Sequence, residues 1–203
     1  MRGYTRFTQE HGDAAASALA GRFADLVRMT VPEFEGELLE LRGDEALCVF
    51  RSARQALRAS VELQRRLRTT TEEDAAFPIG VGMGLDAGEA VPTQGGYRGG
   101  ALNLAARLCS AAKSGQILAT EGVVHLARRV DGIRFSTPRG TRVKGIEQPI
   151  RVVEIIPLDP LPSLTEPPPS RPRRRGWWIA GGVAAAALVA VVVAVGVVVR
   201  GRI

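Results

Sequence analysis

Apolar residues recur along the first 157 positions with two alternating periods. Spacings of three and four residues predict amphipathic helices, whereas alternation at every second residue predicts strands. Helices are expected over His11 to Met29, Ser52 to Arg68, Ala101 to Ala112 and Glu121 to Arg128. Strands are expected over Phe34 to Leu41, Ala46 to Phe50, Pro78 to Val91, Gln116 to Thr120, near Phe135, over Arg142 to Gly145 and over Ile150 to Ile156. This order predicts an α+β domain of ferredoxin-like type over residues 1–157.

A different pattern follows in the C-terminal part of the chain. Residues 177–199 contain no charged side chain and consist mainly of valine, alanine and glycine. As a helix this run would be about 34 Å long, enough to cross the hydrocarbon core of a bilayer. The proline-rich residues 158–176 predict an extended linker, and they include arginines at 171 and 173–175. The positive-inside rule therefore predicts a single-pass membrane protein whose N-terminal domain is cytoplasmic.

Charge and cysteine usage narrow the possible partners. The chain has 27 Lys+Arg against 21 Asp+Glu, a net charge of +6, of which +5 belongs to residues 161–203. The predicted domain is therefore nearly neutral and lacks the basic character of a nucleic-acid-binding domain, so no nucleic-acid partner is expected. Cys48 and Cys109 lie in apolar surroundings at no metal-like spacing, which predicts buried free thiols.

Three segments carry residue types suited to a nucleotide site. Gly3 precedes the first predicted helix, and the backbone amides of such a turn can bind phosphate oxygens; the alternative is an unstructured terminus. Asp44 lies at the tip of the predicted hairpin, where aspartate is otherwise an ordinary turn residue. Asn103 and Arg107 are four residues apart and share one helical face, either as binding groups or as an ordinary solvated pair.

Together these segments resemble the catalytic domain of the class III adenylate/guanylate cyclases. Residues 3–5 (Gly-Tyr-Thr) are similar to the family's Gly-Phe-Thr turn, and residues 41–46 to its Gly-Asp-Ala hairpin, with Glu45 in place of alanine. Residues 99–107 match Gly-x-x-Val-Asn-x-Ala-x-Arg, with Leu102 in place of valine. In the family pattern a metal-binding aspartate stands directly before the position of Met1, so the resemblance implies that an aspartate and its strand would precede this residue.

The resemblance also implies roles for individual residues. It assigns phosphate binding to Gly3, Tyr4, Thr5 and Lys144, metal binding to Asp44, ribose orientation to Asn103, and stabilisation of charge on the α-phosphoryl group to Arg107. It implies two Mg²⁺ or Mn²⁺ ions per site and a homodimer whose two chains share each site. The positions that select the base correspond to Glu40, a guanylate-type residue, and Gly96, which has no side chain. The choice between ATP and GTP therefore stays open.

Two functions from different classes follow. The first is a membrane-anchored nucleotidyl cyclase that converts a nucleoside triphosphate into the 3′,5′-cyclic nucleotide and pyrophosphate for intracellular signalling. The second is a non-catalytic cyclase-like domain that dimerises or regulates a partner at the membrane. A generic ferredoxin-like binding domain would leave the matches at Asp44, Asn103 and Arg107 unexplained.

Overall fold

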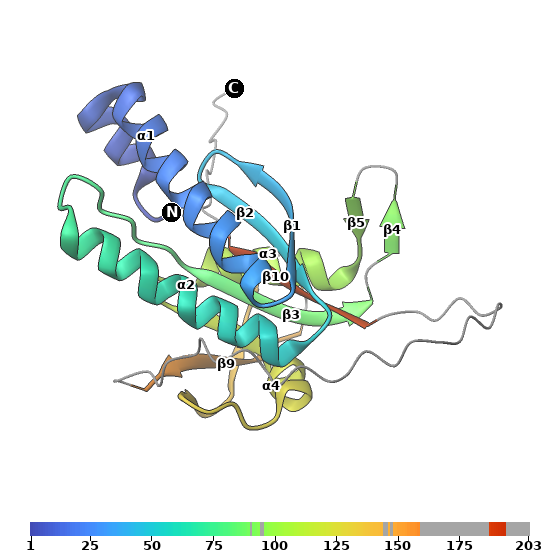
Figure 1. Cartoon of the computed structure of the whole chain (residues 1–203). Coiled ribbons are helices and arrows are strands. Elements are labelled where there is room, and N and C mark those ends of the chain that lie inside the picture. The colour runs from blue at the N-terminus through green and yellow to red at the C-terminus, as the bar shows by residue number, and fades with distance from the viewer. Residues whose placement is uncertain (90, 94–95, 144–145, 147, 159–186, 194–203) are drawn as a thin grey trace, which may run out of the picture.

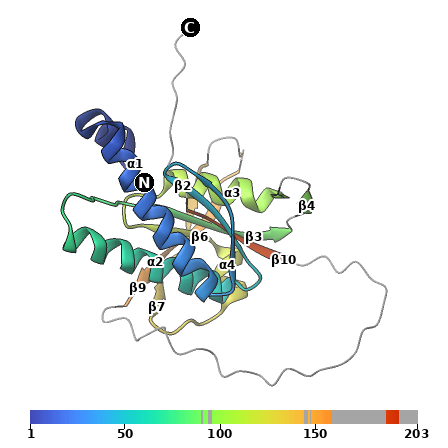
Figure 2. The same ribbon diagram turned by 45° about the horizontal axis from the view of Figure 1, so that its top comes forward.

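An eight-stranded sheet with helices on both faces forms the body of the molecule (Figures 1 and 2). The computed structural model describes residues 1–89, 91–93, 96–143, 146, 148–158 and 187–193. The strands follow the order β1-β2-β10-β3-β6-β9-β7, with β8 paired to β9, and β4 and β5 form a separate two-stranded sheet. The predicted α+β class is confirmed.

The helices lie close to their predicted positions, and the first is longer than expected. Helix α1 spans Tyr4–Glu33 with a kink at Gly12, α2 spans Ala53–Glu73, α3 spans Gly100–Ala111 and α4 spans Glu121–Ala127. The α2 helix begins after Ser52, whose hydroxyl accepts a hydrogen bond from the Gln55 amide at 3.4 Å. The earlier start of α1 places residues 4–10, which carry no strong amphipathic pattern, in the helix.

The predicted hairpin is present and other strand boundaries shift. The strands are β1 Gly36–Arg42, β2 Glu45–Phe50, β3 Met83–Glu89, β4 Val91–Thr93, β5 Gly96–Arg98, β6 Ile117–Thr120, β7 Ile133–Phe135, β8 Arg139–Thr141 and β9 Ile150–Pro157. Of the expected strand over Arg142 to Gly145, residues 142–143 are not in a strand and residues 144–145 lie outside the described residues. Strand β8 lies just before this range and pairs with the start of β9. Residues 78–82 stay outside β3, because its pairing with β6 begins at Met83.

The largest difference concerns the C-terminal apolar run. Ala187–Val193 form strand β10, which lies between β2 and β3 and runs antiparallel to both. The expected helix over 177–199 is therefore wrong for these seven residues, and the rest of that range lies outside the described residues. Valine-rich sequence favours strands, and two neighbouring sheet edges supply the hydrogen bonds. Within the described part of the chain, no helix combines the length and apolar character needed to cross a bilayer.

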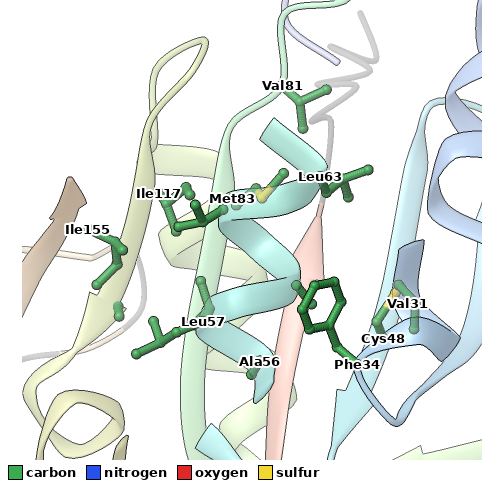
Figure 3. Close-up of a cluster of buried hydrophobic side chains, with 14 of the residues drawn as sticks. Val31, Phe34, Cys48, Ala56, Leu57, Leu63, Val81, Met83, Ile117 and Ile155 are labelled. Atoms are coloured by element: carbon green, nitrogen blue, oxygen red, sulfur yellow. The ribbon is translucent and has the colours of Figure 1, made fainter. Parts of the chain in front are cut away.

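Alternation along β2 shows how the two faces of the sheet are covered. Cys48 and Phe50 are buried in the main core with α1 and α2, whereas Val49 is buried in a second cluster against α3. Successive strand residues face opposite sides, so this single strand contributes to both layers. Figure 3 shows part of the main core around α2, where Leu57 and Met83 are fully buried. The predicted burial of Cys48 and Cys109 is confirmed, and no disulfide joins them.

Candidate functional site

The N-terminal turn is ordered and leads directly into a helix. Gly3 adopts a left-handed conformation (φ 78°, ψ 9°) as the residue before α1, which glycine reaches without steric cost. The backbone N–H of Phe7 donates to the Gly3 carbonyl at 2.9 Å, which closes the first helical turn. The preceding amides of the helix have no partner within it and carry its positive dipole end. Gly3 and Thr5 are exposed, so this turn has the local form of an anion site rather than of an unstructured terminus.

Asp44 is buried at the β1–β2 turn, unlike an ordinary turn aspartate. It is 3% exposed, and the α-amino group of Met1 donates to its carbonyl oxygen at 2.9 Å and to its Oδ2 at 3.3 Å. Burial raises the pKa of Asp44 and lowers the pKa of the Met1 α-amino group to about 5, because both charged forms lose hydration. The structure thus brings the N-terminal turn and the predicted metal ligand together.

Arg2 connects the N-terminal turn to the C-terminal end of α3. Its backbone N–H donates to the Gly80 carbonyl at 2.5 Å, and its guanidinium donates through Nη2 to the Cys109 carbonyl. Sequence reasoning missed Arg2, because nothing in the local pattern distinguishes it from the chain's many other arginines. These contacts fix the N-terminal turn against the last residues of α3 and the segment that precedes β3.

Asn103 and Arg107 form a second group on the same helix. Asn103 is exposed and Arg107 is partly buried, while Ala105 and Leu108 of the opposite face are fully buried. Asn103 lies six residues before Cys109, which corresponds to ~9 Å along the helix axis. Asn103 is therefore separated within one chain from the Arg2 contact at Cys109, whereas Arg107, two residues before Cys109, lies only ~3 Å from that residue along the helix axis.

The structure describes the two predicted base-selecting residues but not the predicted triphosphate-binding lysine. Glu40 is exposed on β1, where its carboxylate accepts a hydrogen bond from Arg42 Nε at 2.6 Å. Gly96 begins β5 and is the register partner of Thr93 in β4. Lys144 lies outside the described residues. Neither Glu40 nor Gly96 is joined to Asp44 by a hydrogen bond or ion pair that the described residues show.

Comparison with known proteins concerns the fold of the domain. No family model matches the chain. A putative adenylate cyclase of Rhizobium meliloti is 26% identical over 169 residues, covering 82% of this chain and 28% of that protein. An adenylate/guanylate cyclase/hydrolase structure from Silicibacter pomeroyi is 29% identical with a TM-score of 0.58, covering 66% of this chain and 80% of that one. The fold is that of an adenylate/guanylate cyclase domain.

A second solved structure has the fold of this cyclase-like domain, and a further curated relative matches its sequence. The guanylyl cyclase Cya2 has a TM-score of 0.66 at 20% identity, with 79% of this chain and 90% of that chain covered. An uncharacterised protein of Mycobacterium tuberculosis is 28% identical over 173 residues, covering 77% of this chain. The chain spans less than a third of the length of these two curated relatives, at 28% of the Rhizobium meliloti protein and 31% of the Mycobacterium tuberculosis protein.

Asp86 is a further polar residue of the cyclase-like domain that sequence reasoning missed. It lies in β3, where burial raises the pKa of its carboxyl group although the Thr120 hydroxyl donates to Oδ1 at 2.6 Å. Its register partner in the adjacent strand is Ala190 of β10. The only signal in the sequence was a carboxylate, Asp86, directly after the apolar residues Met83 and Leu85 of β3. The alternation of apolar and polar residues along this strand could equally place Asp86 at the surface.

The described residues fit the expected metal chemistry only in part. Mg²⁺ is commonly held by one or two carboxylates together with substrate phosphates, and Asp44 supplies one such carboxylate. Among the residues the structure describes, no group of three or more His, Cys, Asp or Glu side chains could hold a metal ion. One ion at Asp44 is compatible with this donor set once the Met1 amino group moves away from Oδ2. Ligands for a second ion are not found in the described part of the chain.

Proposed function

We propose that this chain is the catalytic part of a nucleotidyl cyclase that forms a 3′,5′-cyclic nucleotide and pyrophosphate from ATP or GTP. The observation that carries the proposal is the buried Asp44 beside an ordered Gly3 turn, within a fold shared with cyclase structures. In the reaction the ribose 3′-oxygen bonds to the α-phosphorus, the bond to the β-phosphate oxygen breaks, and the hydroxyl proton is lost.

The residues of this chain would divide that work between binding and charge stabilisation. The amides after Gly3, with Tyr4 and Thr5, hold phosphate oxygens, and Asn103 orients the ribose. Arg107 offers a guanidinium that keeps its charge and can bind phosphoryl oxygens in a bidentate manner. Asp44 would hold Mg²⁺ or Mn²⁺, two ions per site being expected, and such ions neutralise triphosphate charge when bound.

A homodimer is part of the proposal, because the resemblance to the class III cyclases implies a site shared by two chains, and Asn103 lies ~9 Å along α3 from the Arg2 contact at Cys109. In a two-fold dimer, Asp44 of one protomer can face Asn103 and Arg107 of its partner, which creates two equivalent sites. In a state in which residues 187–193 have left the sheet, the apolar residues 177–199 would attach the dimer to a membrane, with the cyclase-like domain in the cytoplasm on the side of the arginine-rich linker.

Complementation between two inactive variants tests both the activity and the shared site. The purified full chain is assayed for cyclic nucleotide and pyrophosphate from ATP and from GTP, with Mg²⁺ and with Mn²⁺. Asp44→Asn and Arg107→Ala should each abolish turnover. When the two are mixed, half of the dimers are mixed and each contains one intact site, so about a quarter of the wild-type activity should return. Activity in either variant alone, or no recovery on mixing, contradicts the shared site.

The second candidate function is a non-catalytic cyclase-like domain that dimerises or regulates a partner. The contact between the Met1 amino group and Asp44 favours it, since that contact occupies the carboxylate that a metal ion would need. This function predicts no cyclic nucleotide from either substrate and an unchanged dimer in the Asp44→Asn variant. Cyclic nucleotide production by the wild-type chain that is lost in this variant would rule it out.

A further inference from the structure

Strand β10 is the connection between the two parts of the main sheet. Residues 189–193 pair with β2 from Phe50 to Ala46, and residues 187–192 pair with β3 from Glu89 to Gly84. The sheet path runs from β2 to β3 only through β10 (Figures 1 and 2). Without it, the β1–β2 hairpin and the β3-β6-β9-β7 group would share no strand pairing within the described residues.

The space that β10 occupies has the width and chemistry of a strand. Neighbouring strands lie about 4.8 Å apart, so β2 and β3 present two facing edges about 9.6 Å apart, each with unpaired N–H and C=O groups if β10 leaves. The flanking residues Cys48 and Phe50 of β2 and Leu85 of β3 are buried. Because unpaired backbone groups among buried apolar side chains are costly, this space favours an extended apolar segment over water.

We infer that the gap between β2 and β3 is a strand-binding slot whose ligand is an extended apolar peptide segment, filled here by residues 187–193 of the same chain. Occupation of the slot excludes insertion of the same residues into a bilayer. A membrane-spanning helix needs ~20 consecutive apolar residues. With 187–193 in the sheet, residues 177–186 and 194–199 are each too short to span alone.

Occupation of the slot also affects the candidate site, a step that rests on the proposed function. Val193 is the register partner of Ala46, two positions from Asp44, so β10 runs toward the buried carboxylate. Helix α3, which carries Asn103 and Arg107, packs across both β3 and β10. The strand therefore fixes the Asp44 hairpin relative to α3. Its transfer to a membrane would release that restraint.

Disulfide formation tests the slot in the full chain. Val191 is the register partner of Cys48, and antiparallel partners have Cα atoms about 4.5–5.5 Å apart, within the range that a disulfide bridges. Val191→Cys is introduced in a Cys109→Ala background, which removes the other native thiol. Val192→Cys is the matched control, since its register partner is Leu47 and a shift of one residue reverses the strand face.

The first measurement is mild oxidation of the lipid-free chain, followed by mass spectrometry of the monomer band. We expect a 48–191 disulfide at least tenfold more abundant than any 48–192 disulfide. Equal yields, no disulfide, or a 48–191 link found only between two chains would overturn filling of the slot by the same chain. This readout needs no turnover, so it is independent of whether the protein proves to be a cyclase.

The second measurement tests exclusion from the membrane. The oxidised Val191→Cys chain and its reduced form are mixed with phosphatidylcholine/phosphatidylglycerol vesicles and then washed with alkaline carbonate. We expect the disulfide-linked chain to be released into the soluble fraction and the reduced chain to be retained at least several-fold more. Carbonate-resistant insertion of the disulfide-linked chain would show that the slot and the bilayer do not compete for residues 187–193.

Discussion

The close approach of α3 to β3 at Gly84 makes this glycine sensitive to a single added methyl group. A Cβ on Gly84 would overlap the Cys109 amide nitrogen and the Ala105 carbonyl oxygen, and would lie 2.8 Å from Cys109 Cα. All three are backbone atoms of α3, so no side-chain rotation relieves the contact. To reach an ordinary carbon–carbon contact of ~3.5 Å, the helix has to move by at least ~0.7 Å.

Gly84→Ala should therefore reduce both stability and activity. Overpacking of a well-packed core costs ~1–3 kcal/mol, and because backbone has to move here we expect about 3 kcal/mol, or a Tm lower by about 6–12 °C. The same displacement moves Asn103 and Arg107. A misplacement of about 1 Å costs ~100-fold in catalysis, so turnover should fall by one to two orders of magnitude in folded protein.

The assay combines urea unfolding with cyclase turnover measured well below the melting temperature. Gly100→Ala is the matched control, because it lies in the same helix and a Cβ there meets no atom within 4 Å. It should change stability by no more than ~0.5 kcal/mol. A Gly84→Ala variant within ~0.5 kcal/mol of wild type would refute the direct backbone contact between α3 and β3.

Further predictions concern the helices. Arg66 of α2 donates to both carboxylate oxygens of Glu33 in α1, at 2.8 and 2.7 Å, so Arg66→Met should lower the free energy of unfolding in urea by about 1–3 kcal/mol. The control Arg68→Met, at an exposed position of the same helix, should lower it by less than ~0.5 kcal/mol. Equal effects of the two substitutions would contradict a specific α1–α2 link. Burial would raise the pKa of Glu62, but hydrogen bonds from two arginines outweigh it and lower the pKa below its ordinary 4.5. The ionised Glu62 therefore stabilises the fold at neutral pH, and this contribution is lost as the pH falls through the lowered pKa. In a profile of unfolding free energy against pH, Glu62→Gln should therefore reduce the loss of stability on the acid side. An unchanged loss would argue against this contribution. Gly122→Ala in α4, where the nearest atom is 3.7 Å from the new Cβ, should raise stability by about 0.5–1 kcal/mol in the same unfolding assay, and a loss would indicate crowding at this site.

Local patterns in the sequence are sufficient to predict the helices and the hairpin. The α2 helix follows from its amphipathic spacing and the Ser52 cap, and the β1–β2 hairpin from two apolar runs around Gly43 and Asp44. The early start of α1 was missed because residues 4–10 carry little apolar periodicity. Their helical state depends on the glycine turn before them, a conformational signal that hydrophobic spacing does not contain.

The environment of the candidate site is less accessible from sequence, because distant segments create it. The tip position of Asp44 follows from the hairpin pattern, but its burial depends on Met1, which reaches it from another part of the chain. The contact between Arg2 and the Cys109 carbonyl likewise joins the first turn to the end of α3. Charge spacing along the chain predicts neither, since both depend on how β3 and α3 pack.

The state of residues 187–193 shows why an apolar run alone does not determine its own structure. The whole apolar run of residues 177–199 satisfies the length criterion for a membrane helix, in which every backbone group is satisfied internally. The same valines also suit a strand, provided that two open sheet edges are available to pair with it. Those edges belong to β2 and β3, far away in the sequence, and they leave the backbone of β10 flanked by partners on both sides. The outcome is therefore a competition between the bilayer and the sheet, and a disulfide between positions 48 and 191 would decide it in favour of the sheet.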